Sequence, residues 1–176
     1  MEKEKGLVLV LTGNGKGKTT AALGLALRSW GHDRNVLMLQ FIKSRQCGEH
    51  LAAERMRPGF EIRPLGLGFI NFNNPEDVAR QRQAAWDALR QVEDVMQSGQ
   101  YQLLILDEIL YALKYRLVEL PTVLTLIDHK PAALHLVLTG RDAPPEIIER
   151  ADLVTEMKEI KHPYQQGIPA RKGIEY

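Results

Sequence analysis

The stretch Thr12-Gly13-Asn14-Gly15-Lys16-Gly17-Lys18-Thr19-Thr20 follows the apolar run Leu7–Leu11 and opens an Ala- and Leu-rich segment, Thr19–Trp30. A phosphate-binding loop (P-loop) stands at such a place, between a strand and a helix. Its glycines let backbone N–H groups turn inward around phosphate oxygens, and the helix N-terminus adds a favourable potential. We expect Lys18 to reach the phosphates and the Thr19 hydroxyl to bind Mg²⁺. The alternative is a glycine-rich turn that only caps the helix, but the glycine spacing together with Lys-Thr favours the P-loop.

This loop is one residue shorter than the usual P-loop pattern. Four residues normally separate the first glycine from Gly-Lys-Thr, whereas three separate Gly13 from Gly17. Thr12 stands at the expected glycine position. We therefore expect the phosphates to lie differently from those in a standard nucleotide hydrolase.

Short apolar runs alternate with helical patterns along the chain. The runs lack a clean hydrophobic–polar alternation, as expected for strands of a parallel sheet that is covered on both faces. The predicted strands are Leu7–Leu11, Val36–Phe41, Phe60–Arg63, Leu103–Leu106, Leu134–Leu138 and Leu153–Val154, and the predicted helices are Thr19–Trp30, Glu76–Ser98, Pro121–His129 and Pro145–Arg150. We predict an α/β fold of the P-loop NTPase-like (RecA-like) type, with three layers, a mostly parallel sheet and helices on both faces.

The composition is that of one soluble globular domain, residues 1–176. Apolar residues make up 44% of the chain and charged residues 26%, and the formal net charge is +1. This balance provides no overall field that would attract nucleic acid or an anionic membrane. Cys47 is the one cysteine, which excludes a disulfide framework and a cysteine-rich zinc site. Because the sequence shows neither a signal peptide nor an apolar run long enough to span a membrane, we expect a cytoplasmic protein.

Two acidic residues follow a predicted strand. Leu103–Leu106 leads directly into Asp107 and Glu108, the pattern of a Walker B segment. Ligands of open α/β sheets bind beyond the carboxyl ends of the strands, so this pair is placed to hold Mg²⁺ directly or through water. The alternative is a pair of acids that stabilises the N-terminus of the helix from Ile109 onward. The neighbouring P-loop favours the metal.

Two arginines are further candidates for the site. Arg141 follows the predicted strand Leu134–Leu138 and would face the same crevice, although a solvated loop arginine is the alternative. Arg28 lies ten residues beyond Lys18 in the first predicted helix, where a surface position is the simplest interpretation.

Two segments are expected to be mostly irregular. Pro58–Asn74 contains one short predicted strand and otherwise is rich in Gly, Pro and Phe, and the last twenty residues contain several Gly and Pro. Long ordered loops in a compact domain are often functional.

Four motifs and the C-terminal segment together resemble the P-loop type of ATP:corrinoid adenosyltransferase. The motifs are TGNGKGKTTAA (Thr12–Ala22), LQFIKS (Leu39–Ser44), LDEI (Leu106–Ile109) and LTGRDAP (Leu138–Pro144), and the segment Ala151–Tyr176 is the most specific part. The resemblance covers nearly the whole chain.

The resemblance implies a reaction in which Co(I) of a reduced corrinoid attacks C5′ of ATP. The 5′-deoxyadenosyl group moves to cobalt, and inorganic triphosphate leaves. The family's shortened loop holds the triphosphate in an orientation reversed from that in other P-loop proteins, which leaves C5′ open to cobalt. Mg²⁺ or Mn²⁺ would be the cofactor, and the corrinoid would be cobalamin, cobinamide or cobyrinic acid a,c-diamide. A reducing flavoprotein would be the partner, and a homodimer is expected.

The resemblance also carries residue roles over by motif position. The triphosphate and nucleotide would be bound by Gly13, Asn14, Gly15, Lys16, Gly17, Lys18, Thr19, Thr20, Arg28 and Arg141. Lys18 would be catalytic because it stabilises the leaving triphosphate. The metal would be held by Thr19 and Glu108, with Asp107 as the neighbouring candidate.

The resemblance assigns Gly68, Phe69, Asn71 and Phe72 to a segment that faces the corrinoid. The family's Gly-Phe-Thr-Trp reads Gly68-Phe69-Ile70-Asn71 here, so Asn71 stands in place of a tryptophan. The family aromatics crowd out the lower axial ligand of cobalt and thereby ease reduction to Co(I). Phe69 would share this catalytic role, and Phe72 is the nearest substitute for the missing ring. The alternative for both phenylalanines is packing beneath the loop.

A second class of function uses the same residues. A P-loop ATPase or a nucleotide-dependent binding module would also need the loop and the Asp107-Glu108 pair. Incubation with ATP alone separates them, because an ATPase releases ADP and phosphate whereas an adenosyltransferase does little without a reduced corrinoid.

Overall fold

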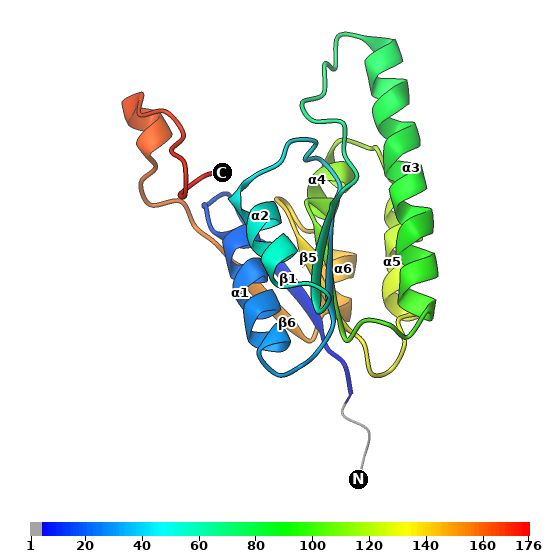
Figure 1. The fold of residues 1–176 in the computed structure, drawn as a ribbon. Coiled ribbons are helices and arrows are strands. Elements are labelled where there is room, and N and C mark those ends of the chain that lie inside the picture. Colours follow the sequence, from blue (N-terminus) through cyan, green and yellow to red (C-terminus); the bar gives the residue numbers. More distant parts are fainter. Residues whose placement is uncertain (1–4) are drawn as a thin grey trace.

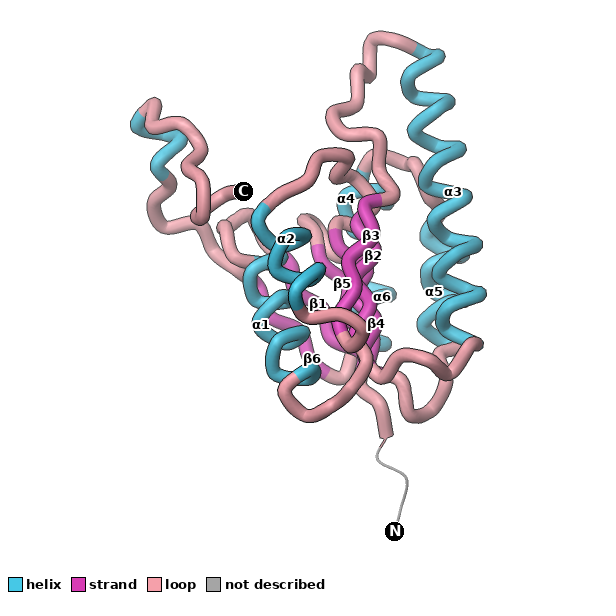
Figure 2. The backbone as a smooth tube through the Cα atoms, in the orientation of Figure 1, coloured by secondary structure: helices cyan, strands magenta, loops and turns pink. Residues whose placement is uncertain are grey.

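The computed structural model describes residues 5–176. At its centre is a six-stranded sheet with the order β3-β2-β4-β5-β1-β6 (Figures 1 and 2). The strands are β1 (Val8–Thr12), β2 (Val36–Gln40), β3 (Phe60–Pro64), β4 (Leu103–Asp107), β5 (His135–Thr139) and β6 (Leu153–Glu156). Every neighbouring pair of described strands is parallel, so the predicted α/β fold with a mostly parallel sheet is confirmed.

Helices cover both faces of this sheet. They are α1 (Lys18–Trp30), α2 (Gly48–Arg55), α3 (Pro75–Gln97), α4 (Ile109–Lys114), α5 (Leu120–Asp128) and α6 (Pro145–Arg150), and a 3₁₀ turn spans Pro163–Gln166. In Figure 1, α1 and α2 lie on one side of the sheet, and α3 and α5 lie on the other. This arrangement makes the three layers that the sequence predicts.

The core is split by the sheet into two apolar clusters. On one side, Val8 and Val10 of β1 pack with residues of α3, α4, α5 and α6. On the other side, Leu9 and Leu11 pack with Ala22 and Ala26 of α1 and with residues of α2 and β3. Successive side chains of a strand point to opposite faces, and both faces are covered here. The strands are therefore continuous apolar runs.

The carboxyl ends of the parallel strands meet at one edge of the sheet, and this edge positions the site. The P-loop follows β1, Asp107 ends β4, and Thr139 ends β5. Because β5 lies between β1 and β4, the P-loop strand and the acidic strand are about 10 Å apart. The loop and the acid pair consequently face one crevice.

All ten predicted strands and helices are present, with ends that differ by at most two residues. Helix α2 was not predicted from the sequence. Only His50 and Ala53 are buried in this eight-residue helix, so its apolar periodicity is too weak to detect. The last twenty residues are irregular apart from the 3₁₀ turn, as expected. Within residues 5–176, no helix combines the length and the apolar content that a membrane crossing requires.

Candidate functional site

The P-loop closes around the ammonium group of Lys18, the first residue of α1. Lys18 Nζ donates hydrogen bonds to the carbonyl oxygens of Gly13 and Gly15, both at 2.8 Å. Burial lowers the pKa of Lys18, and the nearby carboxylate of Glu108 opposes this shift. A lysine ammonium carries three N–H donors, so one remains for a phosphate oxygen.

The C-terminal segment braces the P-loop through backbone contacts. Gly15 N donates to Met157 O at 2.7 Å, and Met157 N donates to Thr12 O at 2.8 Å. A Cβ atom would lie 2.5 Å from Met157 O at Gly13 and 2.8 Å from it at Gly15. These two glycines are therefore required by the close approach of Met157.

Thr12 belongs to the end of β1, which accounts for the shortened loop. Its hydroxyl accepts a hydrogen bond from Ala143 N at 3.2 Å. The residue at the usual glycine position thus ties β1 to the connection between β5 and α6.

Asp107 is fully buried and orients the Thr19 hydroxyl. Its Oδ1 accepts from Thr19 Oγ1 at 2.9 Å and from Thr139 Oγ1 at 2.7 Å, and its Oδ2 accepts from Gln40 Nε2 at 3.1 Å. Because the Thr19 proton points toward Asp107, the oxygen lone pairs are left for a cation. Sequence reasoning found Asp107 but not its partners Gln40 and Thr139.

Glu108, the second residue of the acid pair, has an unusual backbone conformation. Its φ is 64°, in the left-handed region, and its N–H donates to Thr139 Oγ1 at 2.9 Å. Such a conformation costs a non-glycine residue on the order of 1 kcal/mol or more, and strain of this kind clusters at functional sites. Burial raises the pKa of Glu108 and the charge of Asp107 adds to the rise, while Lys18 and Lys43 oppose it.

The donor set suits a hard divalent cation. Thr19 supplies a hydroxyl oxygen, and Glu108 supplies a carboxylate whose negative charge is disfavoured by burial. Mg²⁺ prefers oxygen ligands and is usually held by one or two carboxylates together with substrate phosphates. The residues present therefore fit the cation that the P-loop implies.

A cavity of about 610 Å³ lies beside the P-loop, between α1 and α2. Lys16, Lys18, Thr19 and Thr20 line it together with Glu108. It thus brings the phosphate-binding and metal-binding candidates to one space. Asn14 is exposed on the loop and is not among the lining residues.

Lys43 and Glu49 also line this cavity, and sequence reasoning gave them no role. Lys43 Nζ lies 2.6 Å from Glu49 Oε1. Burial is the largest influence on both groups and disfavours both charges, but their mutual hydrogen bond and the surrounding charges together outweigh it, so the pKa of Lys43 is raised and that of Glu49 is lowered. A lysine just after β2, at the same sheet edge as the P-loop, was the signal that could have revealed this pair.

The two predicted arginines lie in different places. Arg141 is exposed after β5, close enough for its charge to lower the pKa of Lys18. Arg28 lies in the last turn of α1, about 15 Å along the helix axis from Lys18. The structure thus brings Arg141, and not Arg28, next to the P-loop within this chain.

The two phenylalanines of the loop 66–74 lie in different environments. Phe69 is 102% exposed, which contradicts the alternative of packing beneath the loop. Phe72 is half-exposed and stacks on Tyr115 with the ring centroids 4.7 Å apart. Tyr115 also contacts Tyr111, and the centroids of these two rings are 4.3 Å apart. Phe72 therefore belongs to an aromatic cluster, whereas Phe69 is unburied.

Asn71 and Gly68 shape the same loop. Asn71 Oδ1 accepts from Asn73 N at 3.1 Å, and Asn71 N donates to Asp77 Oδ2 at 2.8 Å. Gly68 has a φ of 91°, and a Cβ there would lie 2.8 Å from Ser44 Oγ. The residue in place of the family tryptophan is thus used in a local turn. No residue of 66–74 lines the 610 Å³ cavity.

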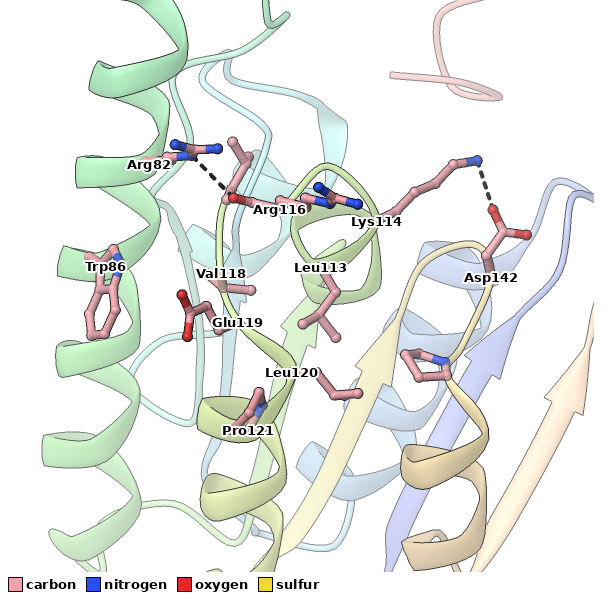
Figure 3. Close-up of a pocket in the computed structure, with 12 residues that line it drawn as sticks. Arg82, Trp86, Leu113, Lys114, Arg116, Val118, Glu119, Leu120, Pro121 and Asp142 are labelled. Carbon is pink, nitrogen blue, oxygen red and sulfur yellow. Dashed lines mark hydrogen bonds and ion pairs between the residues drawn. The ribbon is translucent and has the colours of Figure 1, made fainter.

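A larger cavity, of about 790 Å³, lies between α3, the α4–α5 connection and the start of α6 (Figure 3). Arg82 Nε donates to Arg116 O at 3.2 Å, and Lys114 pairs with Asp142 at 2.7 Å along its rim. None of the predicted site residues lines it. Its size alone therefore does not make it the site of the chemistry.

The geometry agrees with comparisons to known proteins. Residues 4–176 match the family described as ATP:corrinoid adenosyltransferase BtuR/CobO/CobP. The chain is 39% identical to a corrinoid adenosyltransferase of Pseudomonas aeruginosa over 98% of this chain and 85% of that protein. It is 34% identical to one of Escherichia coli K12, over 99% of this chain and 88% of that protein, and 33% identical to the corrinoid adenosyltransferase CobA of Salmonella typhimurium with the same coverage. The family match over residues 4–176, together with relatives that are 33–39% identical over nearly the whole chain, shows that the chain belongs to the ATP:corrinoid adenosyltransferase family.

Proposed function

We propose that this chain, acting as one catalytic domain, transfers the 5′-deoxyadenosyl group of ATP to the Co(I) centre of a corrinoid in cobalamin synthesis or salvage. The observation that carries this proposal is the family match over residues 4–176. It includes the segment around Met157 that packs on the P-loop, so it covers the whole phosphate site rather than a nucleotide-binding motif alone.

The bond changes balance without a general base. Co(I) donates an electron pair to C5′, the C5′–O bond breaks, and its electron pair leaves with the triphosphate, so cobalt becomes formally Co(III). No water is activated in this displacement. Catalysis then depends on in-line positioning of C5′ and on stabilisation of the leaving group.

The phosphate site supplies that stabilisation. Lys18 and the loop amides of Gly13–Thr20 would bind the triphosphate, in the reversed orientation that leaves C5′ open. Thr19 and Glu108 would hold Mg²⁺ (or Mn²⁺), and Asp107 would orient Thr19. The bound cation would neutralise charge on the triphosphate as it departs. Arg141 lies near enough to add a further positive charge, and Arg28 remains a nucleotide-binding candidate at the far end of α1.

The corrinoid would lie against the loop 66–74, with Phe69 toward the lower face of the ring. The full exposure of Phe69 supports this role, because a large exposed aromatic side chain is typical of a binding surface. Gly68, Asn71 and Phe72 would complete that surface. We further propose a cytoplasmic homodimer that receives electrons from a reducing flavoprotein.

A product assay tests the proposed function. The protein is incubated with ATP, Mg²⁺ and chemically reduced cobalamin, and the adenosyl–cobalt product is followed by its absorbance and by chromatography. We expect product only in the complete mixture and little turnover of ATP alone. ADP and phosphate released at the same rate with and without corrinoid would instead identify a P-loop ATPase.

A further inference from the structure

The end of the C-terminal segment returns to the nucleotide cavity. After β6 the chain runs outward through the 3₁₀ turn and comes back, so that its end lies near α2 and the P-loop (Figure 1). Gly173, Ile174, Glu175 and Tyr176 line the 610 Å³ cavity. A Cβ atom at Gly48, the first residue of α2, would lie 3.8 Å from the carbonyl carbon of Tyr176. The segment Gly173–Tyr176 is therefore a wall of the cavity.

This wall is held in a compact turn. The N–H groups of Ile174 and Glu175 both donate to Arg171 O, at 3.1 and 2.9 Å, and Gly173 N donates to Tyr176 O at 2.7 Å. Arg171 N in turn donates to Glu175 Oε2 at 2.8 Å. These bonds fix the backbone from which the side chains of Ile174 and Tyr176 project.

The lining of the cavity has charged and apolar members. Lys18, Lys43, Glu49 and Glu108 are among the charged ones, and Leu23, Leu27, Ile174 and Tyr176 form what we call the apolar half. Leu27 of α1 is 56% exposed, Ile174 is 64% exposed, and Tyr176 is 51% exposed. Apolar side chains that stay exposed around one cavity, next to a few polar groups, are typical of a ligand site.

We propose that Ile174 and Tyr176 bind the adenine of ATP together with Leu23 and Leu27 of α1, which line the same cavity. This inference rests on the proposed function, because that function makes ATP the ligand. The P-loop takes the triphosphate, so the apolar half takes the uncharged part of the same molecule. A purine is flat and apolar on its faces, and a tyrosine ring offers it a stacking surface.

The corrinoid is the other substrate that could fill the apolar half. Its predicted surface, the loop 66–74, contributes no lining residue to this cavity. The adenine assignment thus leaves the surface around Phe69 to the corrin ring.

Binding measurements with two ligands test the adenine assignment. The full chain is titrated calorimetrically with MgATP and with Mg-tripolyphosphate, which carries the phosphates but no adenosine. We expect Tyr176→Ala and Ile174→Ser to weaken MgATP binding, about tenfold for Tyr176→Ala, and to leave tripolyphosphate binding unchanged. Tyr176→Phe retains the ring and should bind MgATP as the unmodified chain does.

Tyr164→Ala is the matched control, because Tyr164 is an 81% exposed tyrosine of the same segment and does not line the cavity. Equal losses for both ligands would overturn the assignment, since the wall would then act through the P-loop. The assignment would also be overturned if Tyr176→Ala left MgATP binding unchanged, or if Tyr164→Ala lost as much MgATP affinity as Tyr176→Ala. A rise in the KM for corrinoid alone in Tyr176→Ala would overturn it as well. Selective loss of MgATP binding in a chain that never forms adenosylcorrinoid would refute the proposed function and leave the adenine site intact.

Discussion

Lys18 is the residue on which the proposed stabilisation of the leaving group depends most. Its ammonium lies at the centre of the P-loop, bound to two carbonyl oxygens and near the carboxylate of Glu108. Loss of one such charged contact in a water-excluded site costs on the order of 3 kcal/mol. We predict that Lys18→Ala lowers the rate of adenosyl transfer about a hundredfold or more, as measured by product formation under saturating substrates.

The control for this variant is Lys161→Ala, which removes an exposed lysine outside the cavity. It should keep the rate of the unmodified chain, and both variants should show an unchanged circular dichroism spectrum. A Lys18→Ala protein that retained more than about a third of the turnover, where about a hundredfold loss is expected, would contradict our placement of the triphosphate.

Glu108 should control the demand for Mg²⁺. The amide of Glu108→Gln keeps the shape of the side chain but removes the charge that attracts the cation. Loss of even an outer ligand of a metal typically costs about 10–100-fold in affinity, so we expect the half-activating Mg²⁺ concentration to rise by at least that factor at saturating ATP. An unchanged concentration would move the metal role to Asp107.

Glu108 also links stability to pH, because its pKa in the folded chain is raised by burial and by Asp107. The folded state disfavours the ionised form, so stability that is present below the ordinary glutamate pKa is lost as the pH rises through the raised pKa. With a chelator present, Glu108→Gln should therefore melt at a higher temperature than the unmodified chain at neutral pH. Each 1 kcal/mol gained corresponds to about 2–4 °C in a chain of this size.

Thermal unfolding measured between about pH 4 and pH 8 tests this linkage. The difference between the two proteins should vanish at the acidic end, where both side chains are uncharged. A difference of the same size at every pH would show that the effect comes from packing and not from ionisation.

At the level of elements, the contact between the P-loop and the segment after β6 can be tested with glycines. Gly15 is in contact with Met157, and a Cβ at Gly24 of α1 would meet nothing within 4 Å. We predict that Gly15→Ala weakens ATP binding because the loop must shift away from Met157 O. Gly24→Ala should instead stabilise the chain by about 0.4–1 kcal/mol, since alanine is the better helix former.

Calorimetric ATP titration and thermal unfolding of both glycine variants provide the measurement. Equally tight ATP binding by Gly15→Ala and Gly24→Ala would contradict this prediction. In that case Met157 would not constrain the loop.

The loop 66–74 should matter for reduction and not for adenosyl transfer. Phe69 is exposed and does not line the nucleotide cavity, and its proposed role precedes the displacement at C5′. We predict that Phe69→Ala harms activity far more with a mild reductant than with Co(I) generated chemically. Ile160→Ala, which removes an exposed apolar side chain outside this loop and outside both cavities, is the control and should leave both rates unchanged. Equal damage under both reductants would contradict the proposed role of Phe69.

Asn71 stands where the family has a tryptophan, and this difference should affect which corrinoid the chain uses. Asn71 is committed to a turn with Asn73 and Asp77, so it offers no bulk to displace a lower ligand of cobalt. A corrinoid without a lower nucleotide loop, such as cobinamide, should be used at least as well as complete cobalamin under a mild reductant. Parallel rates with both corrinoids test this, and a strong preference for cobalamin would contradict it.

Most of the elements could be predicted because their apolar patterns are strong. Strands buried on both faces are continuous apolar runs, and α3 shows a clear helical period, so both were visible in the sequence. Helix α2 buries only two residues and gave no such pattern. The hydrogen bonds between Met157 and the P-loop also could not be predicted from the sequence, because they use backbone groups that any residue carries.

Within the site, the residues that stand in sequence motifs were predictable and their partners were not. These residues are Lys18, Thr19, Asp107 and Glu108, and the spacing of their motifs indicates the chemistry. Glu49 could not be foreseen, because its pairing with Lys43 depends on how α2 packs beside the P-loop. The roles of all these residues stay predictions, and the side chains of Phe69 and Arg28 do not line the nucleotide cavity of this chain.

For the whole molecule, the same loop and acid pair would serve an ATPase, so the fate of the phosphates decides between the two activities. The direct measurement is the stoichiometry of products from γ-labelled ATP, Mg²⁺ and a chemically reduced corrinoid. Adenosyl transfer with triphosphate as leaving group predicts one intact inorganic triphosphate for each adenosyl–cobalt bond, and none without corrinoid. Labelled orthophosphate formed together with ADP, in an amount independent of corrinoid, would contradict it.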